Sequence, residues 1–205
     1  MKRYIKMVAA LLTLMASFTA CENGDQDFDD YEGGTTAYFA YQSPVRTIVL
    51  GDDEYDTTLD KAHKCKILAT FGGSYNGRNA TVNVAVDNSL CDNLTFADGT
   101  PVKAMPAEYY QLSTTAFNFN GGMKGGTEVQ LTDAFFNDPD AVKNTYVIPL
   151  VMQNQTGFDR IATGTLKEGK TGSRTNASIW ETAPQDYVMY CVKYQNKYSG
   201  WWLTN

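Results

Sequence analysis

The stretch Glu128–Met152, EVQLTDAFFNDPDAVKNTYVIPLVM, contains two apolar segments around which the rest of the chain is expected to pack. Val129 and Leu131 alternate with polar residues, which is the period-two pattern of a half-buried strand. Tyr146–Met152 is apolar at nearly every position, as strands covered on both faces are. Between them, Asp138 precedes a proline, the arrangement of an N-cap and the first residue of a helical turn. We therefore expect two sandwich strands joined by a short helical connection.

The rest of the chain shows further short strands separated by turn residues. The most regular alternation is in Ala80–Asp87, where three valines share one face. Pro149 lies within an expected strand and indicates an edge or a bulge there. Short strands, regular turn signals and no long helical period predict an all-β, immunoglobulin-like β-sandwich over residues 35–166. The other expected strands are Thr35–Tyr41, Val45–Leu50, His63–Phe71, Tyr109–Leu112, Ala116–Phe119 and Glu128–Thr132.

The pattern changes after residue 166. Residues 167–176 (KEGKTGSRTN) are polar and contain two glycines, as linkers do. A new apolar run then begins, and Tyr187–Tyr194 is apolar on both faces. Such a strand needs cover on both sides, and few residues follow it. We therefore interpret residues 177–205 as the incomplete start of a second β domain.

The first twenty residues have the pattern of a secretion signal. A positive start precedes an apolar segment that is too short to span a bilayer. Small residues then lead to Ala20 and Cys21, which resembles the cleavage site of bacterial lipoproteins. The interpretation is a lipoprotein signal peptide over residues 1–20, cleaved between Ala20 and Cys21, with lipid on Cys21. The alternative is an ordinary signal peptide with an incidental cysteine.

Residues 21–34 are rich in carboxylates and predict an acidic flexible tether. The carboxylates Asp25, Asp27, Asp29 and Asp30 also resemble the export signal that follows the lipid cysteine in Bacteroidota lipoproteins. This resemblance implies an outer membrane lipoprotein that faces the cell exterior. The alternative is a solvated spacer without a targeting role.

Charge and cysteine content exclude some classes of function. Without the leader the chain has 14 basic and 23 acidic residues, so its net charge is −9 and nucleic acid is not an expected partner. Cys65, Cys91 and Cys191 remain after the lipid cysteine, and an odd number cannot all pair within the chain. Cys65 shares the apolar face of its strand, so we expect a buried thiol there and free thiols overall, with one disulfide as the alternative.

No catalytic, metal or cofactor site is expected. His63 is the sole histidine and has no nucleophile or ligand set at workable spacing, so it is interpreted as a strand-edge residue. Asp25–Glu32 partly resembles the family-18 glycosidase pattern, but Phe28 stands where an aspartate is required. The acidic loop Asp52–Asp56 leaves calcium binding open, although its spacing differs from that of an EF-hand.

Three aromatic residues near the end of the chain are candidate glycan ligands. Tyr198, Trp201 and Trp202 could stack on the apolar faces of sugar rings. The alternative is that they fill the core of the incomplete second domain.

Several runs resemble a Bacteroidota family of uncharacterised N-terminal domains. Such domains open surface lipoproteins encoded with glycan-utilisation systems, and they precede some family-18 endoglycosidases. The resemblance implies an immunoglobulin-like fold and a glycan-binding or adhesive setting, and it supplies no catalytic residues. The runs are Gly51–Asp56, Met105–Tyr110, Val129–Phe136, Asn144–Leu150 and, for the domain that commonly follows, Gln185–Tyr194.

Three functions follow from these observations. The first is a non-catalytic, lipid-anchored surface module for glycan binding or adhesion, with the membrane, glycan and other outer-membrane glycan-uptake proteins as partners. The second is the accessory N-terminal part of a surface glycoside hydrolase whose catalytic domain lies outside this chain. The third is a structural spacer.

Overall fold

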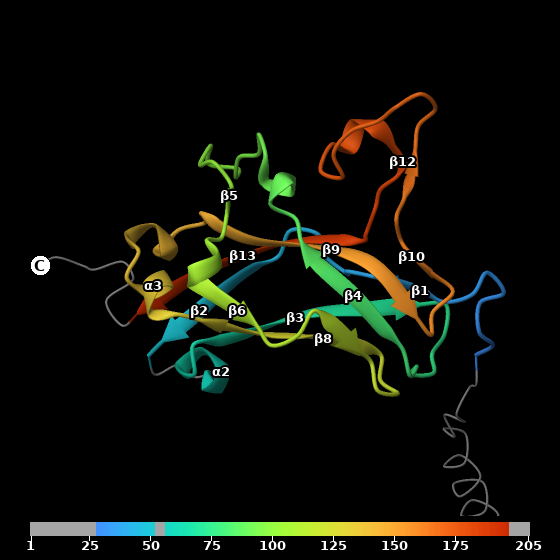
Figure 1. Cartoon of the computed structure of the whole chain (residues 1–205), viewed down its shortest axis with the longest axis horizontal. Helices are drawn as coiled ribbons and strands as arrows, with labels where there is room; N and C mark the ends of the chain where they lie inside the picture. The colour runs from blue at the N-terminus through green and yellow to red at the C-terminus, as the bar shows by residue number, and fades with distance from the viewer. Residues whose placement is uncertain (1–27, 52–55, 197–205) are drawn as a thin grey trace, which may run out of the picture.

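The computed structural model describes residues 28–51 and 56–196, and most of its elements are short strands (Figure 1). In chain order they are β1 (Thr36–Tyr38), β2 (Val45–Leu50), α2 (Thr58–Lys61), β3 (Lys64–Gly72), β4 (Thr81–Val86), η1 (Asn88–Cys91), β5 (Lys103–Ala104), η2 (Ala107–Tyr109), β6 (Tyr110–Leu112), β7 (Ala116–Asn118), β8 (Lys124–Leu131), α3 (Asp133–Phe136), η3 (Pro139–Val142), β9 (Tyr146–Thr156), β10 (Arg160–Ile161), β11 (Thr165–Leu166), η4 (Ala177–Ile179), β12 (Trp180–Thr182) and β13 (Tyr187–Asn196).

The strands form two main sheets with an immunoglobulin-like order. One sheet has the order β10-β1-β3-β8-β6, and the other has β2-β13-β9-β4-β7, with β5 added beside β9. Strands β1, β3, β8 and β6 occupy the positions A, B, E and D of the immunoglobulin fold, while β13, β9 and β4 occupy G, F and C. A separate two-stranded sheet joins β11 and β12. The predicted all-β, immunoglobulin-like fold is confirmed.

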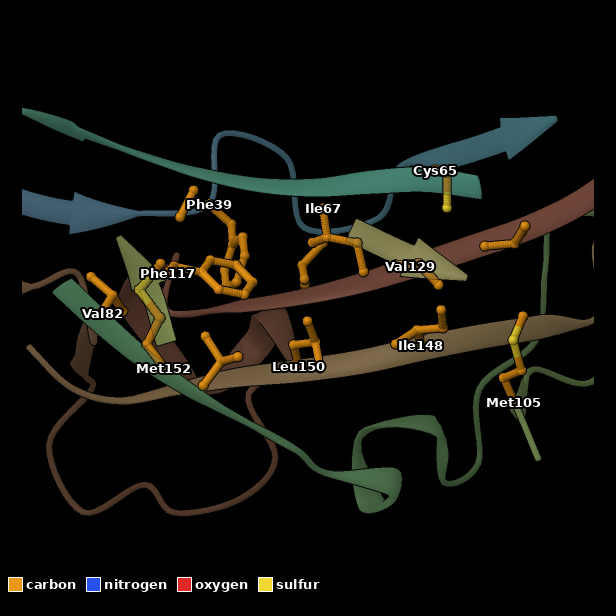
Figure 2. Close-up of a cluster of buried hydrophobic side chains, with 14 of the residues drawn as sticks. Phe39, Cys65, Ile67, Val82, Met105, Phe117, Val129, Ile148, Leu150 and Met152 are labelled. Carbon is orange, nitrogen blue, oxygen red and sulfur yellow. The ribbon is translucent and has the colours of Figure 1, made fainter. Parts of the chain in front are cut away.

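The core lies between the two sheets. Figure 2 shows Ile67 and Val129 from one sheet facing Ile148 and Leu150 from the other. Phe117 packs edge-to-face against the residue after β1, Phe39, with ring centroids 6.3 Å apart. The alternation of apolar residues along β3, β4 and β8 places one side of each strand in this core.

The stretch Glu128–Met152 has the predicted form. Its two strands are β8 and β9, and the short helices α3 and η3 connect them. The Asp138 side chain caps η3 by accepting a hydrogen bond from the Asp140 backbone N–H at 2.8 Å. Residues 146–152 of β9 are all buried, because β9 is an inner strand whose second face is also covered.

Pro149 does not mark an edge or a bulge. Strand β9 lies between β13 and β4, and its irregularity is opposite Asn83 and Val84 instead. The Pro149 carbonyl accepts a hydrogen bond from the Asp87 N–H at 3.0 Å, one residue beyond the end of β4. The missing N–H of proline therefore costs only a bond at the end of the ladder, where an inner strand tolerates it.

The domain boundary expected at residues 167–176 is wrong for the segment that follows it. Strand β13 lies inside the six-stranded sheet, antiparallel to β9 and parallel to β2. Val188 and Val192 point into the main core, while Met189 and Cys191 pack on the opposite face. The strand is apolar on both faces because this same domain covers both, and it is an inner strand of the sandwich.

The expected tether is shorter than residues 21–34. The described residues 28–34 are docked on the end of the sandwich: Asp30 forms an ion pair with Arg78, and the Tyr31 N–H donates to the Gly73 carbonyl at 2.8 Å. Gly73 has a φ of +94°, and a Cβ there would lie 2.4 Å from the carbonyl oxygen of Gly34. Only glycine permits this close approach.

The three cysteines within the described residues, Cys65, Cys91 and Cys191, are free and buried, as expected. The signal peptide with Ala20, the lipid cysteine Cys21, the loop residues 52–55 and residues 197–205 lie outside the described part of the chain. Within that part, no helix combines the length and apolar character needed to cross a bilayer.

Candidate functional site

A groove opens on the outer face of the six-stranded sheet, the face turned away from the main core. Its cavity volume is about 320 Å³. Two excursions of the chain flank it, residues 88–104 and residues 163–186, which rise from the same side of the sandwich (Figure 1). The lining residues are Ser43, Val45, Leu94, Thr95, Phe96, Val102, Val147, Thr175, Tyr187, Met189 and Cys191.

The floor of the groove comes from neighbouring strands of the sheet. Met189 and Cys191 alternate along β13 with residues of the main core, so their side chains reach the outer face. Val147 on β9 pairs with Cys191, and Val45 at the start of β2 pairs with Cys191 from the other side. The floor is therefore continuous, apolar and rigid, because it is built on paired strands.

The first wall is a turn stabilised by its own hydrogen bonds. The Phe96 N–H donates to the Thr100 carbonyl at 2.8 Å, and the Val102 N–H donates to the Leu94 carbonyl at 3.0 Å. Gly99 has a φ of +84°, which the turn requires and glycine adopts without strain. The apolar side chains of Leu94, Phe96 and Val102 then pack on the floor beside the buried Leu90 and Cys91.

The second wall is held by an ion pair next to the sheet. The Nε of Arg174 lies 3.1 Å from both carboxylate oxygens of Asp186, the residue before β13. Asp186 is buried, and this burial raises the pKa of its carboxyl while the Arg174 charge lowers it. The pair fixes the turn that brings Thr175 to the groove.

The lining has hydroxyl groups but no charged side chain. Among the described residues, no hydrogen bond engages the hydroxyls of Ser43, Thr95 and Tyr187, which leaves them available to a ligand. Burial raises the pKa of the Cys191 thiol to about 11, so the thiol is protonated at neutral pH and a poor nucleophile. This arrangement suits an uncharged ligand with apolar faces and hydroxyls at its edge.

A second surface, the aromatic surface, consists of Phe28, Tyr31, Tyr75 and Met123. Their exposed fractions are 58%, 69%, 73% and 37%. The rings of Phe28 and Tyr75 lie 5.1 Å apart at an interplanar angle of 38°. These side chains surround a shallow depression of about 610 Å³ whose floor includes Phe71 at the end of β3.

Two of the site residues predicted from sequence, Asp29 and Asp30, belong to the described part of the chain, and they do not line the groove. Asp29 and Asp30 are exposed beside the aromatic surface, while Asp25, Asp27 and the aromatic candidates Tyr198, Trp201 and Trp202 lie outside the described residues. In the described part of the chain, no group of three or more His, Cys, Asp or Glu side chains could hold a metal ion. Sequence reasoning missed the groove because its residues come from five separated segments, each of which resembles ordinary core or loop.

Fold and groove together define an immunoglobulin-like domain with a concave, uncharged surface site. A family model described as a "-like, N-terminal domain" matches residues 30–159, more than half of the chain. The chain belongs to this Bacteroidota family of uncharacterised N-terminal domains. None of the curated proteins compared with the chain matches it.

Solved structures similar to the chain include two from Bacteroides ovatus. A protein of unknown function from Bacteroides ovatus is 44% identical with a TM-score of 0.77, and the match covers 83% of this chain and 54% of that one. The chain thus spans about half the length of this relative. A candidate carbohydrate binding protein from the same organism is 15% identical with a TM-score of 0.42, covering 77% of this chain and 36% of that one. This second likeness is too remote to inform on function.

Proposed function

We propose that the protein is a non-catalytic, lipid-anchored surface module that binds a neutral glycan in the groove. The observation that carries this proposal is the lining of the groove, which joins an apolar floor to free hydroxyls and contains no charge. Sugar rings present apolar C–H faces and a rim of hydroxyls, so the two surfaces are complementary. The aromatic rings of Phe96 and Tyr187 offer stacking faces within the same site.

The absence of charge from the lining also argues for a neutral ligand. The chain without its leader has a net charge of −9, so anionic glycans are repelled at long range. No lysine or arginine lines the groove to offset this repulsion or to bind a carboxylate or sulfate directly. Uronic-acid and sulfated glycans are therefore the weakest candidates.

Binding without hydrolysis fits the same lining. Glycoside hydrolysis in most families needs two carboxyl groups on either side of the bond that is cleaved. No carboxylate lines the groove, and its thiol is protonated. The groove can hold and orient a sugar, but its lining has no group suited to transfer a proton at neutral pH.

The surface location rests on the sequence. The apolar leader that ends at Cys21 and the acidic residues after it support a lipid anchor on the outer membrane and display to the exterior. Other outer-membrane glycan-uptake proteins are the partners that suit this location. A second candidate function, which the sequence resemblance implies, is an accessory domain of a larger surface glycoside hydrolase; the match covers 54% of the Bacteroides ovatus relative, whose function is unknown.

A glycan array tests the proposed binding. Thr95→Arg places a long side chain in the groove, whereas Ala97→Arg adds the same charge to an exposed position of the same turn outside the lining. We expect wild type and Ala97→Arg to bind the same neutral oligosaccharides and Thr95→Arg to lose at least tenfold in affinity. Equal binding by all three proteins would show that glycans do not use the groove, and no binding by wild type would favour a structural spacer.

A further inference from the structure

We propose that the aromatic surface of Phe28, Tyr31, Tyr75 and Met123 contacts the uncharged part of the membrane interface beside the lipid anchor. This inference rests on the lipid at Cys21, which belongs to the proposed function. It assigns a partner to a surface that lies outside the groove. Most exposed apolar residues on a protein are scattered singly, whereas these four gather around one depression.

Chain length determines what this surface can face. Phe28 follows Cys21 by seven residues, and seven residues span at most roughly 25 Å when fully extended. Phe28 therefore lies within that distance of Cys21 and of the lipid that it would carry. Tyrosine is favoured at the membrane interface because its ring enters the interface while its hydroxyl stays hydrated, and phenylalanine adds apolar contact there.

The segment that carries Tyr31 is held in place by the fold. The backbone of Tyr31 is hydrogen bonded to Gly73, and the Tyr31 ring lies so close to Gly33 that a Cβ there would be 2.1 Å from a ring carbon. The Asp30–Arg78 ion pair fixes the same segment to the end of the sandwich. Because this segment is already ordered, its contact with a surface costs less conformational entropy than that of a free chain.

The charges around the surface select the kind of lipid. Asp29 and Glu32 are exposed next to it, Lys124 is exposed beside Met123, and Arg78 is already paired with Asp30, so negative charge is in excess. Anionic lipid headgroups are therefore repelled, and a zwitterionic surface is preferred.

Quenching by brominated lipid measures this contact in the full lipidated protein. A fluorophore is attached to Asn76→Cys beside the aromatic surface or to Ala97→Cys beside the groove, both exposed positions. The native thiols are buried and stay unlabelled. In phosphatidylcholine vesicles we expect at least twofold stronger quenching at residue 76 than at residue 97, and a smaller difference when anionic lipid is added.

Two controls separate this inference from the proposed anchor. The double variant Tyr31→Ser, Tyr75→Ser should still float with vesicles but lose the difference in quenching. Wild type that fails to float would remove the lipid anchor and this inference with it. The membrane contact alone would be overturned if wild type floats but shows equal quenching at both positions. It would also be overturned if neutral oligosaccharide shields the label at residue 76 more than lipid does.

Discussion

Replacing Val192 by alanine tests whether β13 belongs to the core of the sandwich. Val192 is fully buried in the main core and its backbone pairs with Tyr146 on β9. The variant removes two methyl groups, worth about 0.8 kcal/mol each in transfer from water. The cavity that remains adds about 1 kcal/mol, so the free energy of unfolding should fall by about 2–3 kcal/mol.

Thermal and urea unfolding measure this loss. For a domain of this size, about 1 kcal/mol shifts Tm by roughly 2–4 °C, so the midpoint should fall by about 5–10 °C with an unchanged urea m-value. The matched control is Gln195→Ala, which also introduces alanine but at an exposed position of the same strand. A Val192→Ala midpoint no lower than that of the control would refute the account of β13 and restore a boundary before it.

Three further predictions concern buried and hydrogen-bonded groups. Arg174→Ala leaves the buried Asp186 carboxylate unpaired, and because the Arg174 side chain is partly exposed the cost in urea unfolding at pH 7 should be about 1–3 kcal/mol. The loss should be smaller at low pH, where that carboxyl is protonated, and an equal loss at both pH values would contradict this. Hydrogen bonds from Tyr146, the Asp140 backbone and Tyr109 lower the pKa of the Asp138 carboxyl below its ordinary 3.8. The carboxylate therefore stabilises the fold above pH 3.8, and this stabilisation is lost as the pH falls through the lowered pKa. Asp138→Asn should flatten the fall in urea midpoint between pH 5 and pH 2.5, and an unchanged slope would contradict this. Burial raises the pKa of the Cys65 thiol to about 12 and that of Cys91 to about 11, so iodoacetamide should modify the native thiols at least a hundredfold more slowly than in urea; rapid native labelling would show that the strands open.

Local patterns predicted much of the fold. Alternation along β4 and β8 and the Asp138 cap before Pro139 depend on neighbouring residues alone, and the structure has these features where they were expected. The wrong boundary before β13 has a different origin. A strand with apolar residues on both faces is expected to be covered on both faces, but the pattern does not indicate which elements cover it. Here the turn over residues 88–104 supplies the second cover, and that contact is distant in sequence.

The groove was beyond prediction for a related reason. Thr95 and Thr175 look like ordinary loop residues, and Tyr187 looks like a strand residue. Their convergence depends on sheet order and on the Arg174–Asp186 ion pair. The best sequence signal was the change to a polar, glycine-containing segment after residue 166, which marked an excursion of the chain rather than a linker between domains.

Mapping the bound sugar onto backbone amide resonances tests the central claim most directly. Titrating the isotopically labelled protein with the neutral oligosaccharide preferred on the array should shift amides at residues 94–96, 102, 175 and 187–191, and the shifts should saturate. The Thr95→Arg variant should lose them, whereas Ala97→Arg should retain them. Shifts that cluster instead at Tyr31 and Tyr75, or no saturable shifts at all, would contradict glycan binding in the groove.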